Sequence, residues 1–285
     1  MTRRGSIGAL AALAATLLLA PPGYAQQQAK PQRIVSLNLC TDQLLLELVG
    51  RERIASISFL AQDPEFSAVA DKAKGIAFNR GLAEEIVPLR PDLVLAHKYA
   101  ARQSVAMFQR LGIRVVEIDL PENLAAVKTQ IATVAEAVGE PARGQAMIAN
   151  IERRLASLPS PVGLRLSAAI YEPSGYAFGA NSLADAILRA AGFDNLAARL
   201  GIGGYAQLGM ETLLASPPDL LVVDDTASER RSMAQQFLDH PALRHRFAGN
   251  GRAAVPRRLW ICGGSSVAEA AELLAQARIT REGRR

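Results

Sequence analysis

Residues 82–96 read LAEEIVPLRPDLVLA, and residues 209–223 repeat that pattern more loosely as GMETLLASPPDLLVV. Each stretch reads as a short helix, a Pro-Asp turn and a buried strand. Aligning the two pairs Glu84 with Glu211, 127 positions later in the chain. That spacing is far too long for the period of a solenoid repeat. The pattern therefore predicts two similar lobes, each built on the same unit, with a cleft between them.

The first 25 residues are typical of an export signal. Arg3 and Arg4 give a basic start, an apolar run follows over 7–20, and Ala25 is a small residue suitable for cleavage before Gln26. The run is short for a membrane span, although an uncleaved anchor is the alternative. No cysteine lies near the cleavage point, which argues against a lipid anchor. We therefore expect a protein that is exported to the periplasm, with residues 1–25 removed.

The composition is that of a globular protein, with 49% hydrophobic and 21% charged residues. Removing Arg3 and Arg4 lowers the formal net charge from +5 to +3. This excess is small and scattered, which argues against a nucleic-acid partner. Cys40 and Cys262 are the only cysteines. An exported protein could join them, but the sequence leaves a bridge and two separate thiols equally open.

Strands and helices alternate along the chain, which predicts crossover units and mostly parallel sheets. The fold class is therefore α/β, with an N-terminal lobe over 33–138 and a C-terminal lobe over 164–278. The helix predicted over 141–158 would join them as a stiff strut and permit little hinge motion. The predicted strands are 33–37, 53–58, 93–96, 113–118, 165–171, 220–223 and 253–261, and the predicted helices include 43–49, 124–138, 182–191, 234–238 and 266–277.

In the order and spacing of these segments the chain resembles the periplasmic substrate-binding proteins of the metal-chelate class. These proteins serve ABC importers for vitamin B12, ferric siderophores and haem. The resemblance rests on Ile34-Val35-Ser36-Leu37-Asn38, on the two repeated stretches and on the strut helix. It implies two α/β lobes joined by one long helix, a ligand in the shallow cleft between them, and no catalysis or cofactor. The implied partners of this monomer are a small metal chelate and a permease dimer with its ATPase.

The resemblance also implies roles for two glutamates. Glu84 and Glu211 match the acidic residues with which these proteins dock on arginines of the permease. Two carboxylates well apart on one surface could each form a charge-assisted pair with a guanidinium. The alternative is that each is a solvated glutamate in a first helical turn, where the helix dipole favours an acid.

Ligand contacts are expected on loops at the carboxyl ends of the strands. Flat aromatic side chains suit corrinoid, porphyrin or catecholate surfaces, and Lys98 could meet a carboxylate or amide arm. Core filling is the alternative for about half of the candidates, and His97 could ligate iron or serve only the structure. The ten candidates are Asn38, Phe59, Phe78, His97, Lys98, Tyr171, Tyr176, Phe178, Tyr205 and Trp260.

Two functions from different classes remain. The first is a transport receptor that captures a chelate and delivers it to a permease. The second is an exported, chelatase-like enzyme, which would need a histidine and a carboxylate converging in the cleft. His240 and His245 lie in one segment, but nothing supplies a convincing third ligand, so no metal site of the protein's own is expected.

Overall fold

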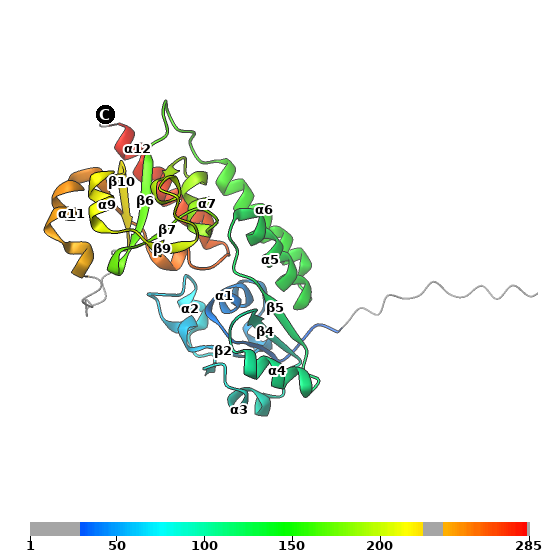
Figure 1. The fold of residues 1–285 in the computed structure, drawn as a ribbon. Coiled ribbons are helices and arrows are strands. Elements are labelled where there is room, and N and C mark those ends of the chain that lie inside the picture. Colours follow the sequence, from blue (N-terminus) through cyan, green and yellow to red (C-terminus); the bar gives the residue numbers. More distant parts are fainter. Residues whose placement is uncertain (1–28, 225–235, 284–285) are drawn as a thin grey trace, which may run out of the picture.

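The structure is a computed structural model that describes residues 29–224 and 236–283. The predicted signal segment lies outside the described residues. Figure 1 shows two lobes, the first in blue to green and the second in green to red. The elements of the first lobe are β1 (Ile34–Ser36), α1 (Leu39–Leu48), β2 (Ile54–Ser58), α2 (Ala70–Ala73), β3 (Phe78–Asn79), α3 (Ala83–Ile86), β4 (Leu93–His97), α4 (Arg102–Arg110), β5 (Val115–Ile118) and α5 (Leu124–Ala137).

The sheet of this N-terminal lobe is parallel throughout, in the order β3-β2-β1-β4-β5. Such a sheet needs a crossover between each pair of strands, and the helices supply it. Strand β4 is buried along its whole length, as expected for a strand covered on both faces. The predicted α/β class is confirmed here.

The second lobe contains β6 (Ser167–Glu172), β7 (Tyr176–Phe178), α7 (Leu183–Ala190), β8 (Asp194–Asn195), α8 (Leu196–Arg199), β9 (Tyr205–Gln207), α9 (Met210–Ala215), β10 (Leu220–Val223), α11 (Pro241–Arg246), β11 (Arg252–Ala254) and α12 (Ser266–Glu282). Its sheet has the order β11-β10-β6-β7-β9, with β8 also paired to β6. Strands β8, β6, β10 and β11 are parallel, but β7 and β9 are antiparallel to their neighbours. The C-terminal lobe is thus mostly parallel, as predicted, with an antiparallel corner that the sequence pattern did not reveal.

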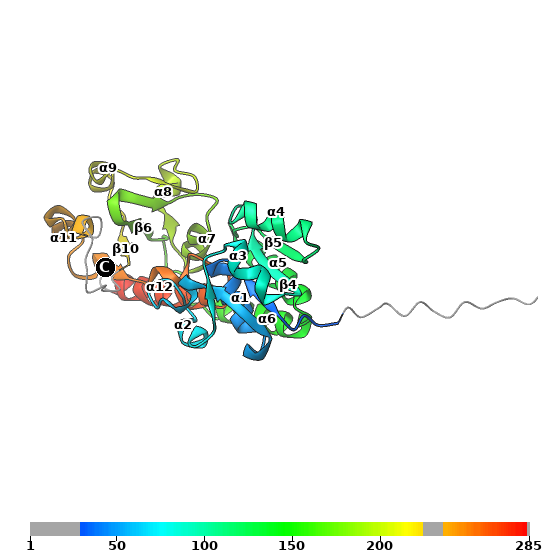
Figure 2. The ribbon, with the colours of Figure 1, turned by 90° about the horizontal axis from the view of Figure 1, so that it is seen from below.

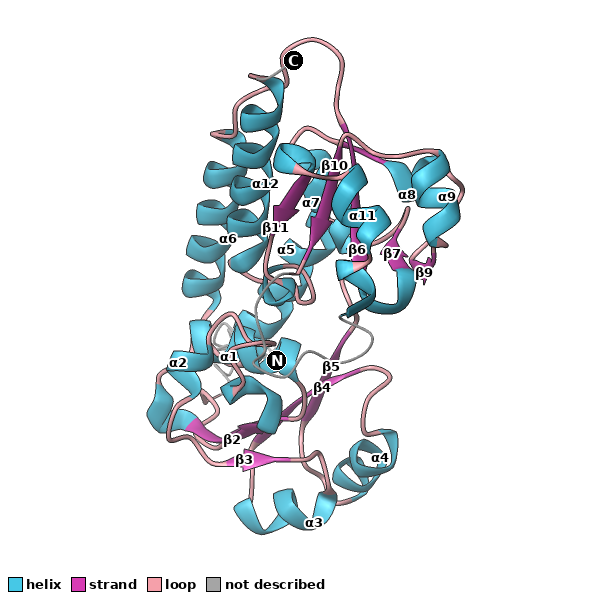
Figure 3. Ribbon diagram, turned by 90° about the vertical axis from the view of Figure 1, so that its left-hand side faces the viewer, coloured by secondary structure: helices cyan, strands magenta, loops and turns pink. Residues whose placement is uncertain are grey.

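The two lobes are connected by α6 (Pro141–Ala156), which is about 24 Å long at about 1.5 Å per residue. It begins with a proline in the first turn, where the missing N–H costs nothing. Helices α5 and α12 lie along it (Figure 3). Gly144 lets α5 approach closely, since a Cβ at that position would lie 2.4 Å from the Cβ of Ala135. Arg154 of α6 also forms a two-pronged ion pair with Glu272 of α12.

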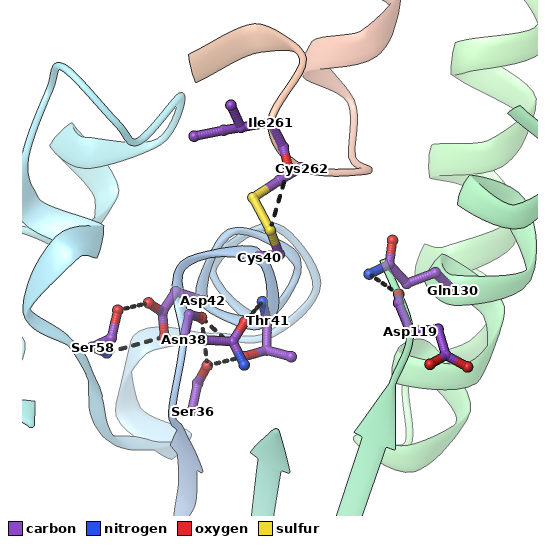
Figure 4. Close-up of a disulfide and its surroundings, with 10 residues drawn as sticks. All are labelled: Ser36, Asn38, Cys40, Thr41, Asp42, Ser58, Asp119, Gln130, Ile261 and Cys262. Carbon is purple, nitrogen blue, oxygen red and sulfur yellow. Dashed lines mark hydrogen bonds between the residues drawn. A yellow bond between two sulfur atoms is a disulfide. The ribbon is translucent and has the colours of Figure 1, made fainter. Parts of the chain in front are cut away.

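A disulfide between Cys40 and Cys262 joins the lobes a second time. Figure 4 shows it between the first turn of α1 and the loop that precedes α12. Figure 2 shows that the start of α12 reaches α1, and there Ser265 donates a hydrogen bond to Glu47. The largest buried hydrophobic cluster also runs without a break from Ile34 in one lobe to Val222 in the other. The lobes are therefore held together by a helix, a disulfide and a shared core.

Two predicted elements differ from the structure. The strand predicted over 253–261 ends at Ala254, because Pro256 lacks an N–H for the ladder and a 3-10 helix over Arg257–Leu259 follows. Trp260 therefore lies after a strand and not within one. The helix predicted over 234–238 falls partly outside the described residues, and its described end is a 3-10 turn, Phe237–Asp239. Within the described residues, no helix is both long and apolar enough to cross a membrane.

Candidate functional site

A cavity of about 710 Å³ lies between the lobes. The first lobe contributes the last residue of β4 and the residues that follow β4 and β5. The second lobe contributes the end of β7, the start of β9, the start of α7 and the segment Trp260–Ile261. The carboxyl ends of parallel strands are where open α/β sheets bind ligands. Its lining residues are His97, Lys98, Tyr99, Asp119, Leu120, Pro121, Glu122, Asn123, Ala126, Phe178, Asn181, Ser182, Leu183, Ala184, Gly204, Tyr205, Trp260 and Ile261.

The aromatic wall of this cavity comes from the antiparallel corner of the second lobe. Tyr205 stacks on Tyr176 with ring centroids 5.0 Å apart, and Phe178 lies 4.7 Å from Tyr205. The register pairs Phe178 with Tyr205 and so places both side chains on one face of the sheet. This wall offers a flat apolar surface of the kind that a planar macrocycle can stack on.

His97 ends β4 in the opposite wall and is buried, with its Nε2 lacking a hydrogen-bond partner. Its Nδ1 accepts the backbone N–H of Tyr99 at 3.4 Å, so the proton of the neutral ring lies on Nε2. Burial lowers the pKa of His97, against the opposing charge of Asp119. The ring is thus a neutral hydrogen-bond donor in this arrangement.

The charged groups lining the cavity are few. Lys98 forms an ion pair with Asp119 at 3.3 Å, and Glu122 is the remaining carboxylate. Within the described residues no three His, Cys, Asp or Glu side chains gather in a way that could hold a metal ion. The cavity therefore offers aromatic surface and hydrogen bonds, with no excess of positive charge.

The sequence matches the family described as "Periplasmic binding protein" over residues 34–252. The chain belongs to this family. A curated relative from Halobacterium salinarum, named a cobalamin-binding protein, is 26% identical over 214 residues, or 73% of this chain and 58% of the relative. The chain thus spans little more than half the length of the curated relatives that it matches.

Solved structures of periplasmic binding proteins share the fold. The haem-binding protein RhuT from Roseiflexus sp. RS-1 has a TM-score of 0.71 and 24% identity, with 88% of this chain and 98% of that chain covered. The vitamin B12-binding protein BtuF of Vibrio cholerae has a TM-score of 0.64 and 15% identity, covering 89% and 98%. These likenesses establish the two-lobed α/β fold.

Of the ten residues that the sequence suggested as ligand contacts, five line the cavity, and Tyr176 joins them by stacking on Tyr205. The others lie elsewhere. Phe59 and Phe78 are each 52% exposed, and Phe78 lies beneath Arg80. The five lining residues are His97, Lys98, Phe178, Tyr205 and Trp260.

Two of the suggested residues have structural roles. Tyr171 is fully buried and donates its hydroxyl hydrogen bond to the carbonyl of Leu208, so it presents no surface to a ligand. Asn38 caps α1, since its side-chain oxygen accepts the N–H of Thr41 (Figure 4). The sequence predicts turn and cap chemistry over 38–42 and a helix from residue 43, whereas α1 begins four residues earlier, at Leu39.

Glu84 and Glu211 are both exposed, Glu84 on α3 of the first lobe and Glu211 on α9 of the second (Figure 3). Sequence reasoning missed other cavity residues, among them Tyr99, Asp119 and Asn181. Tyr99 lies two residues after the end of β4, and Asp119 directly follows β5. Their positions after buried strands were the signal that could have found them.

Proposed function

We propose that this chain is the substrate-binding component of an ABC importer, which captures a metal chelate in the periplasm and delivers it to a membrane permease. The observation that carries the proposal is the cavity between the lobes, with Tyr205 and Phe178 in its wall. Helix α6 connects the two lobes that form this cavity. Its size falls in the usual range for small-molecule sites, about 300–1,000 Å³.

Three classes of chelate fit an aromatic cavity of this kind: ferric siderophores, cobalamin and haem. Names of similar proteins point the same way, since the curated relative is named for cobalamin and RhuT for haem. In this chain the aromatic wall would stack on the ligand, and Nε2–H of His97 would donate a hydrogen bond to it. Glu84 and Glu211 would dock on permease arginines, one from each lobe.

The proposal is tested by titrating the mature protein with cyanocobalamin, haemin and two ferric siderophores. Trp260 lines the cavity and is the only tryptophan of the chain, so its fluorescence reports on occupancy. Saturable binding of one chelate at micromolar concentration or below, without turnover, is the expected result. Absence of binding to all four, by fluorescence and by thermal shift, would overturn the proposal.

A chelatase-like activity is the second candidate. It is favoured by one observation, that His97 and Asp119 line the same cavity and interact electrostatically. The experiment is to incubate the protein with free porphyrin and ferrous or zinc ions and to follow the porphyrin absorbance. We expect no metal insertion above the rate without protein, and a rate that depends on His97 would reverse the assignment.

A further inference from the structure

A buried acid stands at the end of β6, behind the aromatic wall. Glu172 is only 2% exposed, and its Oε1 has no hydrogen-bond partner. The register pairs Glu172 with Tyr176, and Tyr176 lies two residues from Phe178 on the same strand. All three side chains therefore project from one face of the sheet, the face that Phe178 turns to the cavity.

Two unused donors lie beside this carboxylate. Arg257 Nη2 lies 3.8 Å from Glu172 Oε2, while its Nε is buried without a partner. Trp260 lines the cavity, and its Nε1–H faces Glu172 without completing a hydrogen bond. Burial raises the pKa of Glu172, and the charge of Arg257 opposes that rise.

Arg257 also reaches the other lobe. Its guanidinium lies over the ring of Phe66, 5.3 Å from the centroid, so the cluster stands where the two lobes meet. Leaving a buried donor or acceptor unsatisfied costs about 1–3 kcal/mol. One buried acceptor and two buried donors thus lie close together without hydrogen-bond partners. A ligand group that carries both a donor and an acceptor would satisfy them.

The charges around the cavity restrict which ligand group could bind at this site. Lys98 is paired with Asp119, and Glu122 adds a negative charge. Glu172, buried behind the aromatic wall beside Arg257, adds a third carboxylate close to the cavity. A ligand arm that carries a negative charge would meet repulsion here, while a neutral arm with both N–H and C=O groups would not.

We propose that Glu172, Arg257 and Trp260 form a recognition site that selects chelates with neutral amide arms over chelates with carboxylate arms. The amide N–H donates to Oε1 of Glu172, and the amide C=O accepts from Nε–H of Arg257 or Nε1–H of Trp260. A carboxylate arm has no hydrogen to donate and brings its charge against that of Glu172. This inference rests on the proposed function, since it concerns the ligand of the same cavity.

The test uses pairs of chelates that differ in their arms. Dicyanocobinamide and dicyanocobyrinic acid share one corrin ring, with amide arms in the first and carboxylate arms in the second. Ferrichrome, built on peptide amides, and ferric citrate make a matching iron pair. We expect the wild-type protein to bind the amide member of at least one pair at least tenfold more tightly than the carboxylate member.

Glu172→Gln then removes the charge and keeps the shape, and we expect the ratio of the two affinities to fall at least fivefold. Glu136→Gln is the matched control: it removes an exposed carboxylate of α5 that does not line the cavity, and should change the ratio less than twofold. Thermal unfolding verifies that each variant is folded. If Glu172→Gln does not fold, Arg257→Lys keeps the positive charge but lacks Nε–H, and is expected to weaken binding of the amide member at least fivefold.

A carboxylate member or haemin bound as tightly as the amide members would overturn the inference and leave the proposed function standing. The inference would also be overturned if Glu172→Gln still preferred the amide member over the carboxylate member. The same holds for Arg257→Lys where that variant is used in place of Glu172→Gln. Absence of binding to both pairs, haemin and cyanocobalamin would instead sink the proposed function itself. The failures of the two proposals are therefore distinguishable.

Discussion

The repeated unit takes the same form in both lobes, yet its two copies meet the cavity at opposite ends, the first through His97 at the end of β4 and the second through Tyr205 on β9. In the first lobe, β3, α3 and β4 follow each other, and in the second β9, α9 and β10 do so. However, β3 pairs in parallel with β2, whereas β9 pairs antiparallel with β7. Phe78 and Tyr205 each lie six residues before the repeated glutamate of their lobe. Tyr205 on β9 joins the aromatic wall, while Phe78 lies under Arg80 outside the cavity lining. The repeat thus fixes the scaffold, and the added hairpin strand β7 makes the ligand wall.

The largest effect is expected where the two copies are alike. We expect Glu84→Lys with Glu211→Lys to abolish uptake of the bound chelate into cells, because like charges placed across an interface cost several kcal/mol. Chelate affinity in vitro should stay within about twofold, since neither side chain lines the cavity. Glu136→Lys, an exposed charge reversal on α5, is the control. A large loss of affinity in the double variant would contradict the docking assignment.

The first lobe also holds a buried acid, Asp42, that accepts hydrogen bonds from the N–H and hydroxyl of Ser58 (Figure 4). Burial raises the pKa of Asp42 to about 7, from an ordinary 3.8. The folded state therefore binds this proton more tightly than the unfolded chain, and Asp42 lowers the stability as pH rises from about 4 to about 7.

We expect Asp42→Asn to remove this loss, which amounts to about 4 kcal/mol above pH 7. Urea unfolding at pH 5 and pH 8 should show about 3 kcal/mol of it, because part of the loss has already occurred at pH 5. Asp71→Asn on the exposed face of α2 is the control. An unchanged difference between the two pH values would show that Asp42 stays ionised in the fold.

Removal of the disulfide is expected to have the next effect, on the stability of the protein. The bond joins the two lobes, each of which contains one copy of the repeat. Cys40→Ser with Cys262→Ser should lower the free energy of unfolding by about 2–5 kcal/mol, the usual range for a native disulfide. Chemical denaturation of the oxidised protein and of the double variant provides the measurement. Equal stabilities would mean that α6 and the shared core alone hold the lobes together.

Tyr205→Ala and Phe78→Ala separate the two copies of the repeat directly. Loss of the Tyr205 ring breaks the stack with Tyr176 and Phe178, so affinity for the identified chelate should fall about tenfold, or about 1.4 kcal/mol. Phe78→Ala should change it less than about twofold. Similar losses in both variants would place Phe78 on the ligand after all.

The last effect concerns the turn that each copy shares. Asp92 accepts the backbone N–H groups of Gln32 and Arg33, and Asp219 accepts that of Ser167, so each carboxylate ties its own turn to the first strand of its lobe. We expect Asp92→Ala and Asp219→Ala to destabilise the protein alike, by about 1–3 kcal/mol each. A marked difference in thermal unfolding would show that the two copies are less equivalent than their sequences.

The parts that the sequence predicted are those encoded by local patterns. The repeat, the alternation of strands and helices and the proline at the start of α6 sufficed for two lobes and a strut. The antiparallel corner was missed because β7 and β9 have three residues each, too few for a period to show. Glu172, Arg257 and Phe66 come together only through tertiary packing, and no spacing in the sequence links them.

The disulfide also has a consequence for the biogenesis of this periplasmic binding protein. Cys40 lies in the first turn of α1 and Cys262 just before α12, 222 residues apart. If the chain is exported as proposed, the bond can form only after both lobes have crossed the membrane and the C-terminal lobe has met α1. Its oxidation state would therefore record whether translocation and assembly of a given molecule have been completed.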